Sequence, residues 1–181
     1  MRFYNETLNQ KFWSEDKKFD PGIREKLLSI TDDFIDNLDL EGVDIYDVTL
    51  TGSSSNYNYN EYSDLDVHVL IDFKDINDDE ELVKKALDGQ RFVWNLRHNV
   101  SLKGHDVEMY IQDKDEPHVA SGLYSLKDDK WITEPSYDPP SIDIRDVFKK
   151  AGAIETDIEI LKEKILKARG KEAKNLHDRA K

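Results

Sequence analysis

The chain has 181 residues, with 39 acidic and 26 basic side chains and a formal net charge of −13. This length fits one domain, or one domain with a tail, and is long enough to bury a sizeable core. Cysteine is absent, which excludes disulfide frameworks, thiolate metal sites and a cysteine nucleophile. The acidity argues against a general nucleic-acid binder, which needs basic side chains to replace phosphate counterions. No apolar run approaches the roughly 20 residues of a membrane span and the N-terminus lacks signal-peptide features, so we expect a cytoplasmic protein without membrane contacts.

The charge is unevenly distributed along the chain. Residues 162–181 contain eight basic and three acidic side chains, a charge of +5. Residues 1–161 contain 18 basic and 36 acidic side chains, a charge of −18. The body is therefore more acidic than the whole-chain value indicates, and the tail is the part that suits an acidic partner.

The first predicted element is a helix that begins at Asp20-Pro21 and runs to about Leu38. Asp is a good helix cap and Pro is well tolerated at the first helical position. Apolar residues follow at helical spacing, at Ile23, Leu27, Ile30 and Phe34. Residues 45–51 then read as a strand, and a polar segment from Gly52 to Ser63 follows it.

Two further strands are predicted, at residues 65–71 and 106–112. In the first, Leu65, Val67, Val69 and Ile71 share one face, and Asp64, Asp66, His68 and Leu70 share the other. In the second, Val107, Met109 and Ile111 point inward, and Asp106, Glu108, Tyr110 and Gln112 point outward. A helix between them begins at Asp78-Asp79 and ends near Asn99, with its apolar residues at Leu82, Ala86, Val93 and Leu96.

The remaining chain predicts a hairpin, a linker and a last helix. Residues 122–126 and 130–133 flank Asp128-Asp129 as hairpin strands, and prolines mark a linker over residues 135–140. From Ser141 the pattern is helical, with Ile154, Ile158, Leu161, Ile165 and Ala168 at helical spacing. We therefore expect an α+β (α/β-like) domain over residues 1–134, built on a mixed sheet with helices on one side, and a C-terminal amphipathic helix over residues 141–181 with a basic end.

Three carboxylates carry the strongest chemical signal. Asp64 and Asp66 share one face of a strand with their Cα atoms about 6.6 Å apart, so their oxygens can converge on one cation. Glu108 joins them if its strand is a neighbour, and oxygen ligands of this kind favour Mg²⁺ or Mn²⁺ shared with substrate phosphates. Upstream, Gly52-Ser53 directly follows a strand, where glycine allows close backbone approach and a serine hydroxyl suits a phosphate.

The run Leu50-Thr51-Gly52-Ser53, followed after ten residues by Asp64-Leu65-Asp66-Val67, resembles the signature of the DNA polymerase β-like nucleotidyltransferase superfamily. A later strand in that family supplies a third acidic residue, which corresponds to Glu108 here. The chain is also similar to small stand-alone predicted nucleotidyltransferases of tailed bacteriophages, which would place it in a host cytoplasm. That likeness lies in Tyr110-Ile-Gln-Asp, Gly122-Leu-Tyr-Ser-Leu and Lys130-Trp131-Ile132.

The resemblance implies transfer of a nucleoside monophosphate from an NTP to a hydroxyl acceptor, with release of pyrophosphate. Asp64 and Asp66 would hold the metal ions, and Glu108, as a third metal residue, would help the second metal ion or a base to activate the acceptor hydroxyl. Gly52 and Ser53 would contact the phosphates. The acceptor is open between an RNA end, a protein hydroxyl, a small molecule and another nucleotide. A catalytically inactive binding or regulatory protein of the same fold is the alternative, and a pyrophosphokinase related to alarmone synthetases ranks last.

Several residues keep two interpretations at this point. The family usually has aspartate as its third acid, so Asp106 is an alternative to Glu108. His68 is either a ligand or a structural histidine, and Tyr57 or Tyr59 either stacks on a base or belongs to a flexible polar loop. Arg91, Arg97 and Lys103 are candidates to meet a triphosphate, with ordinary surface charge as the alternative. The C-terminal helix packs on the body, or it contacts RNA, a partner or a second copy.

Overall fold

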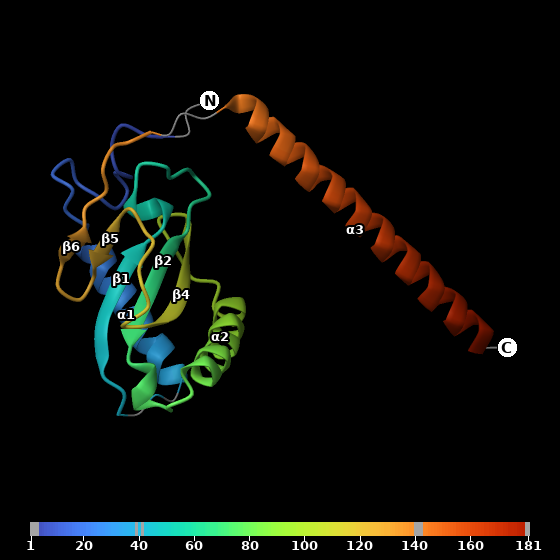
Figure 1. Ribbon diagram of the computed structural model, residues 1–181, viewed down its shortest axis with the longest axis horizontal. Coiled ribbons are helices and arrows are strands. Elements are labelled where there is room, and N and C mark those ends of the chain that lie inside the picture. Colours follow the sequence, from blue (N-terminus) through green and yellow to red (C-terminus); the bar gives the residue numbers. More distant parts are fainter. Residues whose placement is uncertain (1–3, 39, 41, 140–142, 180–181) are drawn as a thin grey trace. The chain divides into compact units, whose positions relative to one another are not determined.

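A computed structural model describes residues 4–38, 40, 42–139 and 143–179, with the backbone alone from residue 169. The chain forms two units, residues 1–139 and residues 140–181 (Figure 1). The predicted linker end at Pro140 and helix start at Ser141 lie outside the described residues, as do the side chains of the basic tail from residue 169. No helix in the described ranges is long and apolar enough to cross a membrane.

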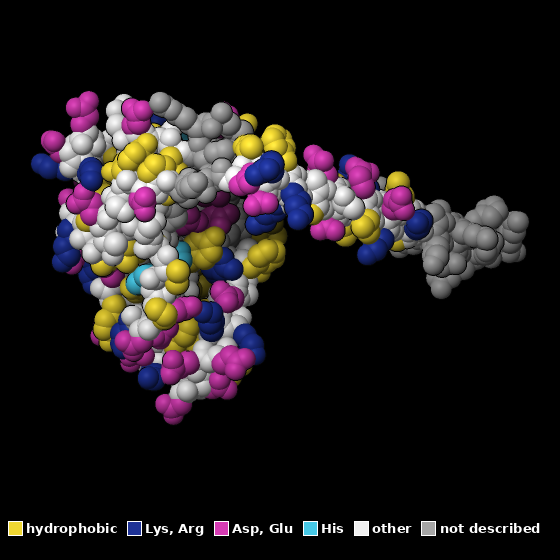
Figure 2. Space-filling view, turned by 45° about the horizontal axis from the view of Figure 1, so that its top comes forward, with side chains coloured by type: hydrophobic (Ala, Val, Ile, Leu, Met, Phe, Trp, Pro, Cys, Tyr) yellow, Lys and Arg dark blue, Asp and Glu magenta, His cyan; other side chains and the backbone are white. Residues whose placement is uncertain are grey.

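A mixed six-stranded sheet forms the first unit, which confirms the predicted α+β class. Its spatial order is β3-β4-β2-β1-β5-β6, in which β2 and β4 are parallel and the other neighbours antiparallel. The strands are β1 (Ile45–Thr51), β2 (Leu65–Ile71), β3 (Ser101–Leu102), β4 (His105–Asp113), β5 (Leu123–Ser125) and β6 (Lys130–Thr133). Strand β3 is the one that the sequence pattern does not predict. Acidic side chains are spread over the face of this unit that Figure 2 shows.

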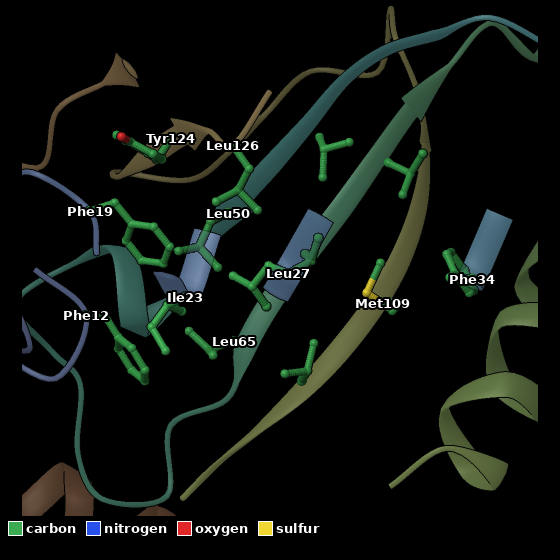
Figure 3. Packing of buried hydrophobic residues seen from close by; sticks show 14 of the residues in the cluster. Phe12, Phe19, Ile23, Leu27, Phe34, Leu50, Leu65, Met109, Tyr124 and Leu126 are labelled. Carbon is green, nitrogen blue, oxygen red and sulfur yellow. The ribbon is translucent and has the colours of Figure 1, made fainter. Parts of the chain in front are cut away.

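Helix α1 (Pro21–Asn37) covers the apolar face of the sheet, behind β1, β2 and β4 in Figure 1. It begins as predicted, because the Asp20 carboxylate accepts a hydrogen bond of 2.9 Å from the Ile23 backbone N–H. Figure 3 shows Ile23 and Leu27 pointing toward Leu50 and Leu65 of the sheet. The predicted stripe is confirmed, with Ile23, Leu27 and Phe34 buried and Ile30 half-buried against the core. The adjacent Thr31 is also buried, and its hydroxyl donates to the Leu27 carbonyl oxygen.

Helix α2 (Glu80–Arg97) also has the predicted position, capped by the Asp79 carboxylate at its N-terminus. Its buried residues are Val83, Leu87 and Trp94. The predicted apolar face was wrong, since Leu82, Val93 and Leu96 are exposed and Ala86 is also outside the core. The helix is rotated toward Phe34 of α1, whose ring meets the Trp94 ring edge-on at 5.0 Å.

Side chains of the N-terminal segment close one end of the core. Phe12, Trp13 and Phe19 are buried, and the Trp13 ring stacks on Trp131 of β6 at 4.4 Å. Tyr124 of β5 meets the Trp13 ring edge-on at 5.0 Å. The hairpin of β5 and β6, which was predicted, is therefore part of the same core as the sheet.

Helix α3 (Ile144–Arg179) forms the second unit. Its described side chains from Ile144 to Ala168 are exposed along their whole length.

Candidate functional site

A left-handed glycine ends β1 and brings the chain against a carboxylate. Gly52 has φ +74°, and a Cβ at this position would lie 1.9 Å from Oδ2 of Asp66. No side chain fits in that space, so only glycine allows the backbone to approach the carboxylate this closely. The short 3₁₀ helix η1 (Ser53–Ser55) follows at once.

Hydrogen bonds tie this turn to the start of β2. The Ser53 hydroxyl lies 2.8 Å from the Ser63 hydroxyl, and the Ser54 hydroxyl donates to the Asp64 carbonyl oxygen at 2.5 Å. Ser63 is itself held by His105, whose Nδ1 lies 2.6 Å from the Ser63 carbonyl oxygen. Bonds from Ser53 and Ser54 therefore hold the turn beside the start of β2, and His105 in turn holds Ser63 in place.

Parallel pairing of β2 and β4 brings two carboxylates side by side. Asp66 and Glu108 are direct partners in the register of the two strands, and Thr51 is the partner of Asp66 on β1. Burial raises the pKa of Asp66 to about 6, with further contributions from the negative charges of Glu108 and Asp64. Of the two candidates for the third acid, Glu108 is the one paired with Asp66.

Asp64 lies just before β2 and belongs to the same electrostatic cluster. Burial raises its pKa, and the charges of Glu108 and then Asp106 raise it further, partly offset by His105. The Asp106 side chain is exposed, and its negative charge affects the cluster by raising the pKa of Asp64. The four carboxylates together form a negative field that a cation would relieve.

A tyrosine holds Glu108 in place. The Tyr110 hydroxyl donates to Oε2 of Glu108 at 2.5 Å. Burial, together with this carboxylate, raises the pKa of Tyr110, so the phenol keeps its proton and stays a donor. Tyr110 was placed on the outward face of its strand by the sequence pattern, but its link to Glu108 was not foreseen.

The carboxylates fit a cation that is shared with a substrate better than one held by protein alone. In the described ranges no group of three or more Asp, Glu, His or Cys side chains is arranged as a metal site. Mg²⁺ is commonly held by one or two carboxylates, with substrate phosphates and water supplying its other oxygens. Asp66 and Glu108 supply such a pair, and no ion pair with a Lys or Arg neutralises either of them in the described part of the chain.

A pocket of about 350 Å³ adjoins the carboxylates on the open face of the sheet. The rings of His68 and Tyr110 stack at 4.7 Å on this face, and the Arg91 guanidinium of α2 lies 4.7 Å from the Tyr110 ring centroid. The Gln112 Oε1 accepts a hydrogen bond of 2.9 Å from His68 Nδ1, and burial lowers the pKa of His68, which favours a neutral imidazole. Thr51, the residue before Gly52, also lines the pocket.

The structure separates the remaining candidates. His68 is packed between Tyr110 and Gln112, an arrangement that gives it a role in the pocket lining. Arg91 lines the pocket, whereas neither Arg97 nor Lys103 does. Tyr57 is buried in the core, so the expectation that it stacks on a base or lies in a flexible loop was wrong. Its apolar ring is better satisfied inside the core than in water.

A larger hollow of about 720 Å³ lies beside the N-terminal segment, around Phe12, Phe19 and Tyr124. Neither hollow is lined by the clustered carboxylates, but the smaller pocket is lined by Thr51, the partner of Asp66, and by Tyr110, which donates to Glu108. The smaller pocket is therefore the better candidate for chemistry. No protein-family model, no curated protein and no solved structure matches the chain.

Proposed function

We propose that the protein is a metal-dependent nucleotidyltransferase, which moves a nucleoside monophosphate from an NTP to a hydroxyl acceptor and releases pyrophosphate. One observation carries the proposal: the Gly52 backbone lies against Asp66, which is itself paired with Glu108 across parallel strands. A phosphate-binding turn and a cation-binding pair of carboxylates are thus held in one place, as transfer from a triphosphate requires.

In this proposal Asp64, Asp66 and Glu108 hold Mg²⁺ or Mn²⁺, and the Gly52-Ser53 turn contacts the phosphates. A divalent ion bound there would neutralise the triphosphate and the leaving pyrophosphate. The acceptor oxygen forms a bond to the α-phosphorus while the bond from that phosphorus to the oxygen that bridges it to the β-phosphorus breaks. With Glu108 on the cation, the acceptor hydroxyl would be activated by the metal and would release its proton to water, while the Tyr110 hydroxyl keeps the Glu108 carboxylate oriented.

The pocket beside Tyr110 suits the acceptor. In-line displacement needs the attacking and leaving oxygens on opposite sides of the phosphorus. The row of Asp66 and Glu108 lies between the Gly52 turn and the pocket, so pyrophosphate would leave on one side and the acceptor would enter from the other. A volume of about 350 Å³ fits a small molecule or a single nucleotide unit. Arg91 gives the pocket a cation for an anionic group of that acceptor.

The test is incubation with each α-labelled NTP, Mg²⁺ or Mn²⁺ and a host lysate, followed by separation of small molecules, RNA and protein. We expect label in the small-molecule fraction for the wild type and none for Asp66→Asn, while Asp75→Asn, at an exposed carboxylate, retains transfer. Arg91→Gln should lose transfer while still binding NTP. Label in no fraction would count against catalysis.

The alternative function, a binding or regulatory protein of the same fold, is favoured by the absence of a ready-made metal cluster in the described ranges. Thermal unfolding separates the two. An enzyme of the proposed kind is stabilised by NTP only with the divalent ion, on the order of 2–3 kcal/mol at a hundredfold excess over Kd. A binding module is stabilised by nucleotide without transfer, and equal stabilisation in Asp66→Asn would exclude this site.

A further inference from the structure

Helix α3 carries a heptad pattern of apolar residues. Its apolar residues alternate at spacings of three and four through eight consecutive positions. They are Ile144, Val147, Ala151, Ile154, Ile158, Leu161, Ile165 and Ala168. Alternation of this kind over more than three heptads is the signature of a coiled coil, with Ile144 at an a position and Val147 at a d position.

The seam is exposed, although it is the most apolar surface of the helix. Ile154, Ile158 and Leu161 are 53%, 45% and 56% exposed. Figure 2 shows hydrophobic side chains along the described part of α3, interleaved with charged ones. A long helix depends mainly on packing of its apolar face, so this face needs a partner.

The width of the seam points to another helix as that partner. A helix that packs on a globular body usually presents a broad stripe of three or four apolar residues in two turns. Apart from Phe148 at an e position near its start, the α3 seam is confined to the a and d positions, the narrow pattern that keeps two supercoiled helices in register. Alanine at Ala151 and Ala168 lets two backbones approach closely at these layers.

Charges beside the seam select a second copy in parallel orientation. In a parallel pair, each g residue faces the e′ residue five positions later on the partner helix. Lys150 then faces Glu155 and Asp157 faces Lys162, which are attractive pairs, whereas Lys164 corresponds to Arg169, so two of the three charged pairs in the sequence favour this orientation. An antiparallel pair with full overlap of the seam would instead place Asp157 against Asp157 and Lys150 against Lys164.

We propose that α3 pairs with α3 of a second copy of this chain in a parallel, in-register, two-stranded coiled coil. The dimer joins two copies of the chain through α3, and this proposal does not depend on the proposed activity. Lys162, which now lies 2.7 Å from Glu159 of its own helix, turns to Asp157 of the second copy.

Light scattering coupled to size exclusion tests the dimer on the full chain. We expect a mass of twice the 21.1 kDa chain for the wild type. Ile158→Lys buries a charge at an a position and should raise the dimer Kd by at least about a hundredfold. Ile160→Lys is the matched control, because Ile160 is 46% exposed against 45% for Ile158 but lies outside the seam, and it should remain dimeric.

Orientation is tested by oxidation and by charge exchange. The chain has no cysteine, so Ala151→Cys creates a single thiol that forms an interchain disulfide only where two Ala151 positions face each other. Lys150→Glu should weaken the dimer, and adding Glu155→Lys should restore it. A monomeric wild type, including one with α3 packed on its own body, overturns the proposal, as do a trimer, no cross-link at residue 151 or no rescue by the charge exchange.

Discussion

Gly52 shows how a backbone position, and not a side chain, sets the geometry of the candidate site. Its φ of +74° is one that other residues rarely adopt, and the space where a Cβ would lie is occupied by the Asp66 carboxylate. Positive φ and close approach are separate requirements, and this residue meets both. The conformation costs other residues stability, and the contact restricts where the carboxylate can point.

Substitution Gly52→Ala separates these two requirements when it is compared with Gly104→Ala. Gly104 has φ +83° with nothing within 4 Å of the point where an added methyl group would lie, so it should lose only about 1 kcal/mol from backbone strain. Gly52→Ala should lose about 2–4 kcal/mol and also the stabilisation by Mg²⁺ and NTP, because Asp66 must move. Chemical denaturation with and without ligand measures both, and equal losses for the two variants would contradict the close approach.

The raised pKa of Asp66 makes the stability of the protein depend on pH. Well below the unfolded value of 3.8, at about pH 3 or lower, the carboxyl is protonated in both the folded and unfolded states. Between the unfolded value of 3.8 and the folded value of about 6, the folded state holds a proton that the unfolded state has lost, so stability falls as pH rises. Above this range the charged carboxylate costs the folded state on the order of 2 kcal/mol, since partial exposure screens the full shift.

Asp66→Asn should therefore be more stable than the wild type above pH 6 by roughly this amount, with the difference lost by about pH 3. Denaturant unfolding at a series of pH values measures it, and Asp75→Asn, at an exposed carboxylate, should follow the wild type throughout. Saturating Mg²⁺ should reduce the difference at neutral pH by stabilising the wild type alone. A constant difference between Asp66→Asn and the wild type at every pH would rule out the burial of charge as its cause.

At the scale of elements, α2 both covers the core and closes an open edge of the sheet. Strand β3 pairs with only the first residues of β4, which leaves the rest of that edge without a neighbouring strand. The Asn95 side chain fills this gap at Met109, where its Nδ2 donates to the carbonyl oxygen at 2.9 Å and its Oδ1 accepts from the backbone N–H at 3.1 Å. One turn earlier, the same helix places Arg91 over Tyr110. The edge contact thus fixes the wall of the pocket.

Asn95→Ala should lower the free energy of unfolding by about 1–2 kcal/mol, because two hydrogen bonds to half-buried backbone groups are lost. Gln90→Ala, at an exposed position of the same helix, makes a smaller gain in helix propensity than Asn95→Ala and should be nearly neutral, so propensity cannot explain a loss in Asn95→Ala. Thermal denaturation compares them. Equal stability of the two variants would show that the edge of β4 does not need the amide.

Helix caps and apolar periodicity predict where the helices and most of the strands lie. They do not predict which face of α2 is buried, because tertiary packing determines it. Asp20 and Asp79 are both helix caps, as their positions before Pro21 and Glu80 indicate. The buried face of α2 was missed because the helix carries apolar residues all round, and contact of Trp94 with Phe34 selects among them. Strand β3 was missed because two residues carry no periodicity.

At the scale of the whole molecule, the sequence predicts that Asp66 and Glu108 lie together only if their two strands are neighbours in the sheet. The alternation of apolar and polar residues places each carboxylate on the polar face of its strand. That the two strands are neighbours does not follow from the sequence, and the structure shows it in the register of β2 and β4. The pocket was beyond prediction, because it joins residues from β1, β2, β4 and α2 that are distant in sequence. Whether the site turns over a nucleotide remains a prediction.

The parallel pairing of β2 and β4 also has a consequence for how the protein folds. The chain must pass through α2 and β3 before β4 can reach β2, whereas β1 and β2 are joined directly. Closing this long crossover costs conformational entropy before its contacts form, which slows such pairings. A partly folded chain therefore holds Asp66 without Glu108, so a bound cation should retard unfolding far more than it speeds refolding.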